Sequence, residues 1–338
     1  MTPPANHHPV AVIGAGLAGL SCAHRLLAAG YSVHVFEKSR GPAGRMSTRR
    51  AEDDAGPWQC DHGAQYFTAR DPAFRAEVAR WEAAGAAARW DARLSSFDGS
   101  AWSTPQTPLE RFVGTPRMTA PAGWLASGLG NAGALQLQTT VQRIERSAAG
   151  WRIVSAEHGE HAPTYGTVVL AVPAPQAAQL LAPVSSAATA LAQSARMRGS
   201  WAVMLRFAAP VRMDWDGAFI NTGPLRWVAR DSSKPGRQGQ ETWLLHASPE
   251  WSEAHIEDTA DSVTAELVQS FTALGGPAPL AATAHRWRYA DTEPPLTMGC
   301  WWDDTLHLGL AGDWLHGGKV EGAWLSGQAV AGRIIGQD

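Results

Sequence analysis

Residues 10–37 read VAVIGAGLAGLSCAHRLLAAGYSVHVFE, and this stretch decides the fold class. The apolar run at 10–13 predicts a strand buried on both faces, as in a parallel sheet. Residues 17–29 place apolar side chains at helical spacing, and Gly30 follows where helices commonly end. A second strand-like run ends at Glu37. A strand, a helix and a second strand in so short a stretch predict a βαβ unit with a right-handed crossover.

The turn between the first strand and the helix carries Gly14, Gly16 and Gly19. In this pattern the first glycine makes a tight turn, the second admits a pyrophosphate, and the third lets helix and strand pack closely. The helix N-terminus offers free N–H groups to the phosphates. Glu37 follows Gly19 by 18 residues, at the place where an acidic side chain bonds ribose hydroxyls. The stretch therefore predicts a dinucleotide site.

Glu37 also bears on which dinucleotide is bound. Its charge would repel a 2′-phosphate, which disfavours NADP as the tightly held ligand. Residues 37–46, EKSRGPAGRM, place glycines and Arg45 directly after the second strand. A basic group there can neutralise a diphosphate, and we expect Arg45 to contact the cofactor. Lys38 and Arg40 are either further contacts or solvated loop charges. Together these features favour FAD.

Composition limits the class of protein. The 338 residues carry 28 basic and 31 acidic side chains, a formal net charge of −3, which argues against a nucleic-acid-binding protein. Apolar residues make up 45%, which argues against disorder. Three cysteines without a CxxC pair argue against a zinc ribbon or a disulfide framework, and no metal site is expected. Without a long apolar run or a basic N-terminus, we expect a soluble, cytoplasmic protein with no membrane contact.

The rest of the chain predicts a second, sheet-rich part. In order, the pattern indicates a helix from Asp71-Pro72 to about 84, a loop-rich crossing between domains at 95–116, two strands within 135–154, a buried strand at 168–172, three strands within 200–246, a helix at 252–274, a strand at 281–290 and a final helix at 322–335. We expect an α/β protein with a Rossmann-type FAD-binding domain on a parallel sheet and an α+β substrate domain. The bounds expected are 8–75, 130–190 and 285–338 for the first domain, and 76–129 and 191–284 for the second.

The C-terminal stretch at 312–323 also predicts contacts with the cofactor. Asp313 follows Gly312 at a strand end, where its carboxylate would accept hydrogen bonds from the ribityl or phosphate part of FAD. Residues 319–323, KVEGA, open the last helix. Its N-terminus would point at the N1–C2=O edge of the flavin, where a helix dipole stabilises negative charge. A terminal packing helix is the alternative reading.

Six stretches carry a family resemblance. They are GAGLAG (14–19), FEKSRGPAGRMSTRR (36–50), DHGAQYFTARD (61–71), VVLAVPAPQ (168–176), HRWRYA (285–290) and GLAGDWLHGGKVEGAWLSGQAVA (309–331). With them the chain resembles the flavin-containing amine oxidase superfamily, and most closely its renalase-like bacterial members. The resemblance implies a backbone contact from Val141 to adenine. It also implies noncovalent FAD, because the spacing of Cys300 does not match the cysteine that links the flavin in some relatives.

Cofactor contacts are therefore expected from Gly14, Gly16, Leu17, Ala18, Gly19, Glu37, Lys38, Gly44, Arg45, Met46, Val141, Gly312, Asp313, Val320, Glu321, Gly322 and Ala323. For the renalase-like group, the resemblance implies oxidation of the 2- and 6-dihydronicotinamide isomers of NAD(P)H to NAD(P)⁺, with O₂ as acceptor and H₂O₂ as product.

Pocket residues are less well marked. His246 lines up with a histidine near the flavin face in renalase-like sequences and is the catalytic candidate, with a buried core histidine as the alternative. Gln65, Tyr66 and Trp287 are candidates for the pocket wall, with plain packing as their alternative. A nucleotide substrate would favour a cationic pocket mouth, for which the candidates are Arg226, Arg230, Lys234 and Arg237; a solvated turn is the other reading.

Two rival functions stay open. One is an FAD-dependent amine oxidase or a related desaturase-like oxidase, for which 16 tryptophans allow an aromatic funnel. Amine oxidases often place a lysine near flavin N5, and the few lysines of this chain offer no good candidate. The other is a flavin-binding sensor or partner-binding module without turnover. Steady peroxide production with any substrate would exclude this last class.

Overall fold

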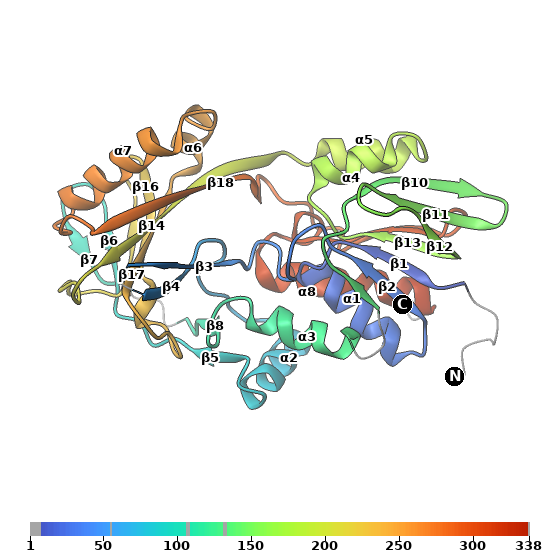
Figure 1. Cartoon of the computed structure of the whole chain (residues 1–338), viewed down its shortest axis with the longest axis horizontal. Coiled ribbons are helices and arrows are strands. Elements are labelled where there is room, and N and C mark those ends of the chain that lie inside the picture. Colours follow the sequence, from blue (N-terminus) through green and yellow to red (C-terminus); the bar gives the residue numbers. More distant parts are fainter. Residues whose placement is uncertain (1–7, 55, 106–108, 131–133, 337–338) are drawn as a thin grey trace.

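The computed structural model describes residues 8–54, 56–105, 109–130 and 134–336. Two large sheets lie at opposite ends of the molecule, and the hairpin of β3 (Thr48–Asp53) and β4 (Gly56–Asp61) lies beside one of them, against β17 (Glu241–Ala247) (Figure 1). The predicted α/β class is confirmed, with a parallel sheet in one part and a sheet-rich second part.

The first sheet has six strands in the order β19-β20-β13-β1-β2-β9. Their bounds are β19 Trp301–Asp303, β20 Leu308–Leu310, β13 Thr167–Leu170, β1 Val10–Ile13, β2 Val33–Phe36 and β9 Leu135–Gln136. All neighbours are parallel except β19 and β20. The predicted βαβ unit is confirmed, because β1 pairs in parallel with β2 and α1 (Leu17–Ala28) connects them. Gly30 has a φ of +86°, as the predicted helix end requires.

Both faces of this sheet are covered. Val10 and Val12 pack with α1, α2 (Pro72–Ala83), α3 (Ala120–Gly130) and α8 (Lys319–Ile335), whereas Ala11 and Ile13 pack with α4 (Ala174–Leu181) and α5 (Ser186–Ser194). The three-stranded sheet of β10 (Val141–Ser147), β11 (Gly150–Ser155) and β12 (Gly159–Tyr165) lies on the second side (Figure 1). This is why the run at 10–13 is apolar at every position.

The second large sheet has seven strands in the order β18-β14-β17-β16-β15-β6-β7. Their bounds are β18 Ala281–Thr292, β14 Met197–Phe207, β17 Glu241–Ala247, β16 Leu225–Arg230, β15 Gly217–Ile220, β6 Leu94–Phe97 and β7 Trp102–Ser103. Helices α6 (Pro249–Ala254) and α7 (Ala260–Ala273) cover it on the side away from β3 (Thr48–Asp53) and β4 (Gly56–Asp61) (Figure 1). A short pair, β5 (Ala87–Arg89) with β8 (Phe112–Gly114), completes the strands.

Several predicted elements differ from the structure. The single helix expected at 252–274 is two helices, because the Thr259 hydroxyl accepts a hydrogen bond from the Ser262 N–H and starts α7 afresh. The final helix begins at Lys319 rather than at residue 322. The stretch expected as a loop-rich crossing at 95–116 supplies β6 and β7 to the edge of the large sheet. Strand β15 was not predicted, because four residues that begin with glycine carry little strand signal.

The division into two domains stays a prediction. Two segments bear on its bounds. Most of β18 is expected in the first domain, yet β18 is hydrogen bonded to β14 in the large sheet. Helix α3 is expected in the second domain, yet it packs against α1 beside the parallel sheet. Within the described ranges, none of the helices has the length and apolar character that a membrane span requires. The same residues contain no cluster of three or more His, Cys, Asp or Glu side chains suited to a metal ion.

Candidate functional site

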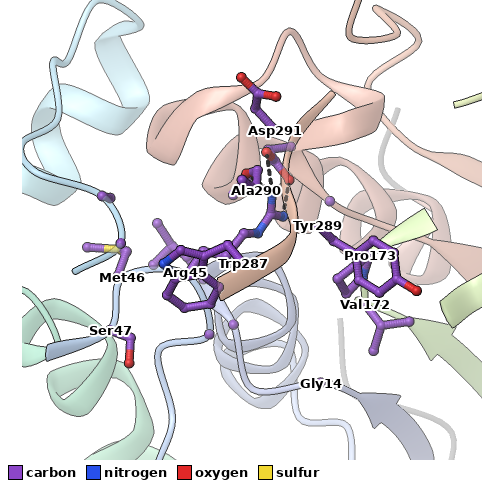
Figure 2. A pocket seen from close by; sticks show the side chains of 18 of the residues that line it. Gly14, Arg45, Met46, Ser47, Val172, Pro173, Trp287, Tyr289, Ala290 and Asp291 are labelled. Carbon is purple, nitrogen blue, oxygen red and sulfur yellow. Dashed lines mark hydrogen bonds and ion pairs between the residues drawn. The ribbon is translucent and has the colours of Figure 1, made fainter. Parts of the chain in front are cut away.

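A cavity of about 1540 Å³ lies between the two large sheets. Pockets for single small ligands usually measure roughly 300–1,000 Å³, so this cavity has room for a dinucleotide together with a second molecule. Its lining comes from the β1–α1 turn, the segments after β2 and β4, the large sheet and the start of α8. Figure 2 shows Arg45 near the centre of the pocket, between Met46 and the strand that carries Trp287, Tyr289 and Ala290.

The β1–α1 turn forms one end of the cavity. Gly14 has a φ of +104°, and a Cβ there would lie 2.6 Å from the Ala171 carbonyl oxygen. Gly16 lines the cavity and has open space where a Cβ would be, so its backbone is accessible to a ligand. No side chain caps the N-terminus of α1 at Gly16, which leaves its first N–H groups available for a phosphate. Gly19 does not line the cavity; its Cβ would lie 2.0 Å from the Gly14 carbonyl oxygen.

Glu37 lies beside this turn and is 7% exposed. Its Oε2 accepts a hydrogen bond from the Ala15 N–H at 2.9 Å, and its Oε1 accepts one from the Ser39 N–H at 2.8 Å. These two bonds fix the carboxylate at the cavity wall. Each oxygen keeps a lone pair with which it can accept from ribose hydroxyls.

Arg45 and Asp313 form a bidentate ion pair in the cavity wall. The Arg45 Nη1 donates to Asp313 Oδ2 at 3.1 Å and to the Ala290 carbonyl at 3.0 Å, and its Nη2 donates to Asp313 Oδ1. The side chains are 29% and 10% exposed. The sequence predicts both as separate cofactor contacts; the structure joins them into one unit that ties the segment after β2 to the turn before α8.

The remaining predicted cofactor contacts divide into two groups. Those that line the cavity are Leu17, Ala18, Lys38, Gly44, Met46, Val141, Gly312, Val320 and Ala323. Glu321 and Gly322 do not. The Glu321 carboxylate accepts hydrogen bonds from the N–H groups of Arg70 and Asp71, and a Cβ at Gly322 would lie 2.0 Å from the His316 carbonyl oxygen. Both residues hold the start of α8 against its neighbours instead.

The nucleotide end of the cavity fits FAD. It combines an uncapped helix N-terminus for the diphosphate with a fixed acidic side chain for the adenosine ribose. The cavity continues from there to the N-terminus of α8, whose positive end is suited to an anionic flavin edge. A dinucleotide bound at Glu37 would therefore extend toward the large sheet.

One row of side chains on the large sheet forms the opposite wall. Phe219 is paired across strands with Trp227, Trp227 with His246, His246 with Ala202, and Ala202 with His285. Residues that face each other across antiparallel strands point to the same side of a sheet. All of them except Ala202 line the cavity. Five strands thus place one phenyl ring, one indole ring and two imidazoles in one row, with the small Ala202 between the imidazoles.

His62, from the segment after β4, packs against this row. Its ring lies 4.6 Å from that of His285 and 5.3 Å from that of Trp287, between ring centroids. The His62 carbonyl accepts hydrogen bonds from Trp287 Nε1 at 2.8 Å and from His246 Nε2 at 3.2 Å. Because a carbonyl only accepts, His246 carries its proton on Nε2 and presents Nδ1 as an acceptor. The buried Nδ1 of His62 has no partner among the described residues.

The three imidazoles are neutral at pH 7. Burial lowers the pKa of His246 to about 4 and, with repulsion from Arg49, lowers that of His285 to about 4. Burial and the neighbouring His285 lower the pKa of His62 to about 3. These imidazoles can therefore form hydrogen bonds with a ligand without presenting a charge to it. His62 and His285 were not singled out in the sequence, although both lie in the quoted stretches 61–71 and 285–290.

Those pKa values predict a pH dependence of stability. We expect the free energy of unfolding to fall as the pH falls from about 6.5 to about 4, because each histidine binds a proton more readily in the unfolded chain. Asp231 opposes this trend, since burial raises its pKa to about 6 and the folded chain then binds its proton more readily. Burial also lowers the pKa of His34 and His161, so the histidines together outweigh Asp231 and leave a net fall. Urea unfolding at a series of pH values measures it, and His285→Gln should flatten the slope; rising stability toward pH 4.5 would contradict this prediction.

Of the predicted pocket residues, Gln65, Tyr66, Trp287, Arg226 and His246 all line the cavity. Gln65 is not free to bind a substrate through its amide. Its Nε2 donates to the carbonyls of Asp61 and Gly63, and its Oε1 accepts from Lys234 Nζ at 3.2 Å. The side chain thus braces the segment that carries His62.

The expected cationic mouth is mostly absent from the lining. Lys234 and Arg237 are buried, and the side chain of Lys234 is fully enclosed. They form a buried ion cluster with Asp61 and Asp231: Lys234 Nζ lies 3.1 Å from Asp61 Oδ2 and 2.7 Å from Asp231 Oδ1, and Arg237 Nη2 donates to Asp61 Oδ2. Arg230 pairs with Glu241 at 2.8 Å. Of the four candidates, Arg226 alone lines the cavity.

Comparison with known proteins agrees with this architecture. The model of NAD(P)-binding Rossmann-like domains matches residues 12–81. Similar solved structures include a putative protoporphyrinogen oxidase from Exiguobacterium sp. 255-15, with 11% identity, 98% of this chain and 99% of that chain covered and a TM-score of 0.77. Putrescine oxidase bound to putrescine has 13% identity, 99% and 100% coverage and a TM-score of 0.70. Cyclohexylamine oxidase from Brevibacterium oxydans IH-35A has 12% identity, 98% and 99% coverage and a TM-score of 0.72.

At these identities the solved structures establish the fold. The family follows from a second sequence match, in which the model described as flavin containing amine oxidoreductase covers residues 123–335, more than half of the chain. Membership implies a flavin cofactor, in accord with the cavity described above. The chain is therefore an oxidoreductase that belongs to the flavin-containing amine oxidoreductase family.

Proposed function

We propose that this protein is a renalase-type oxidase, which holds FAD noncovalently and oxidises 2- and 6-dihydronicotinamide isomers of NAD(P)H to NAD(P)⁺, with O₂ as the acceptor. The observation that carries the proposal is the uncharged, largely aromatic wall of the large sheet, made by Phe219, Trp227, His246 and His285. The arginines of this part of the lining are already paired, Arg226 with Asp291 and both Arg286 and Arg288 with Glu257. A flat, uncharged nicotinamide ring suits such a wall better than an alkylammonium group does.

The carboxylates of the lining support the same choice. Both Asp291 oxygens accept from Arg198 at 3.2 Å, and Asp313 is paired with Arg45. Glu37 accepts from two backbone N–H groups at the far, nucleotide end. Among the described lining residues, each carboxylate therefore already has a partner, and none is left to bind the ammonium group of an amine substrate.

Noncovalent FAD is proposed from the position of the cysteines. Cys22 and Cys60 are buried, and Cys300 is partly exposed. None of the three is among the residues that line the cavity. We also propose a cytoplasmic location, with which the free cysteines are compatible.

The bound flavin would supply the hydride acceptor, which is the redox chemistry the protein lacks. The chain's own residues would hold the cofactor and orient the substrate. The α1 N-terminus and Glu37 would bind the dinucleotide, and the Arg45–Asp313 pair would fix its position between the two sheets. The neutral His246 offers a hydrogen-bond acceptor to the substrate at Nδ1. Trp227 and Phe219 exclude water from the ring that reacts.

An anaerobic titration tests this proposal. We expect 6-dihydroNAD and 2-dihydroNAD to bleach the flavin absorbance rapidly, while NADH and a panel of mono- and polyamines bleach it slowly or not at all. Readmission of air should restore the colour and release H₂O₂.

Each other outcome has a defined meaning. Bleaching by an amine alone would contradict the proposal and favour the amine oxidase alternative, with which the aromatic wall is compatible. Flavin that none of these compounds reduces would favour the non-catalytic alternative. A purified protein that takes up no FAD would contradict the cofactor assignment itself.

A further inference from the structure

Strand β18 bulges where it runs along the cavity. Between the cross-strand pairs Arg198–Asp291 and Ser200–Trp287, β14 has one residue and β18 has three, residues 288–290. All three of these residues line the cavity. Bulges are common next to functional sites, where they redirect a side chain. The bulge therefore marks this part of β18 as a place to look for a ligand contact.

Tyr289 is the central residue of the bulge, and its hydroxyl has no partner. The residue is partly exposed and lines the cavity, and within the described ranges its hydroxyl forms no hydrogen bond. The oxygen is also not one of the enclosed polar atoms, so a ligand can reach it. By contrast, the hydroxyls of Tyr31 and Tyr165 are bonded within the protein, to the Ile334 carbonyl and to His34 Nδ1.

Two observations place the bulge at the diphosphate part of the cofactor site. The Ala290 carbonyl, next to Tyr289 in the chain, accepts from Arg45 Nη1 at 3.0 Å. In Figure 2 the Tyr289 side chain points toward Val172, and Val172 Cγ1 lies 3.1 Å from where a Cβ at Gly14 would be. Gly14 belongs to the turn before the uncapped N-terminus of α1, which is the end of the cavity suited to a diphosphate.

We propose that the Tyr289 hydroxyl donates a hydrogen bond to the diphosphate of the bound FAD. A phenol is an uncharged donor, so it can bind a phosphate oxygen without competing with Arg45 for the Asp313 carboxylate. The strand that supplies His285 and Trp287 to the substrate wall then also holds the cofactor. The inference rests on the noncovalent FAD of the proposed function, but it does not depend on which substrate is oxidised.

The test measures FAD binding to the apoprotein by the change in flavin fluorescence. We expect Tyr289→Phe to weaken FAD binding by about 10-fold, as for the loss of one hydrogen bond to a charged group. ADP carries the diphosphate without the flavin, so it should compete with FAD and lose affinity by the same factor. Adenosine carries no phosphate and should compete equally well in the variant and the wild type.

Tyr31→Phe is the matched control. It removes the same hydroxyl from a partly buried tyrosine that does not line the cavity. It should bind FAD and ADP like the wild type. Circular dichroism checks that both variants fold.

A second measurement needs no variant. The chain has four tyrosines, and in wild-type apoprotein labelled with 3-fluorotyrosine, ADP should shift a ¹⁹F resonance that adenosine leaves in place. In Tyr289→Phe that resonance should be missing.

The inference is overturned if Tyr289→Phe binds FAD and ADP with wild-type affinities, or if it binds FAD more weakly but ADP unchanged. It is also overturned if ADP shifts no tyrosine resonance of the wild type, which decides the matter even if the variant does not fold. Failure of the cofactor assignment has a different signature, since the wild-type protein then takes up no FAD. An FAD-loaded protein that no dihydronicotinamide isomer bleaches would contradict the proposed substrate and leave this contact standing.

Discussion

Lys234→Met should lower the free energy of unfolding by about 3–5 kcal/mol, the usual cost of breaking a buried ion pair from one side. The Lys234 side chain is 0% exposed, and its ammonium contacts Asp61, Asp231 and Gln65. Without it, two buried carboxylates share the single guanidinium of Arg237. The Oδ2 of Asp231 already has no hydrogen bond among the described residues.

The decrease in the free energy of unfolding caused by Lys234→Met should be larger at high pH than at low pH. Burial opposes the charge of Asp61, but Lys234 and Arg237 outweigh it and hold the pKa of Asp61 below its usual range. Burial and the charge of Asp61 raise the pKa of Asp231 to about 6. Removing the ammonium raises both pKa values further, so the deficit should be largest above pH 6 and shrink as the carboxylates take up protons at lower pH.

Urea unfolding at pH 7.5 and pH 5 measures both effects. The double variant Lys234→Met with Asp231→Leu is the control, since replacing a buried pair by apolar groups is often close to neutral. We expect it to recover much of the stability that the single variant loses. A Lys234→Met protein as stable as the wild type at pH 7.5 would show that the cluster does not hold buried charge.

Arg45→Met should weaken FAD binding by about 100-fold or more. The change removes the charge-assisted hydrogen bonds that we expect Arg45 to make with the diphosphate, worth roughly 1.5–3 kcal/mol each. It also leaves the Asp313 carboxylate unpaired in the cavity wall. An uncompensated anion there would repel the diphosphate. Arg45→Lys should restore only part of the affinity, because one ammonium cannot reproduce the bidentate pair or reach the Ala290 carbonyl as well.

Fluorescence titration of FAD into the apoprotein measures this affinity. Arg40→Met is the control, because Arg40 lies in the same segment but is exposed and outside the cavity lining. It should bind FAD like the wild type. If Arg45→Met kept wild-type affinity, the Arg45–Asp313 pair would tie two segments together without contributing to the cofactor site.

Much of the nucleotide end could be predicted because its determinants are local. Gly14 and Gly16 lie in one turn, and Glu37 reaches back to the Ala15 N–H within a single βαβ unit. A helix start such as Asp71-Pro72 is equally local, and the Asp71 carboxylate accepts from the Ala73 and Phe74 N–H groups as that pattern predicts. Where a contact spans few residues, the residue types and their spacing are sufficient.

The substrate wall could not be predicted in this way. Phe219, Trp227, His246 and His285 come from four strands, and they form a row only through the pairing of those strands. Periodicity within one strand shows which residues share a face, but it carries no information about which residue of a neighbouring strand lies opposite. Hence the sequence marks His246 alone and assigns no role to His285 within its motif.

By itself the sequence determined the class of fold, the dinucleotide turn and the acidic residue that answers it, because steric and hydrogen-bonding rules act over a few neighbouring positions. Only the tertiary structure determined which of the basic residues between 226 and 237 line the cavity and which are buried. Arg226 reaches the cavity, whereas Lys234 is buried against Asp61, which lies 173 residues away in the chain. A charge is buried only where distant segments supply its counter-charge, and no local pattern records which segments those will be.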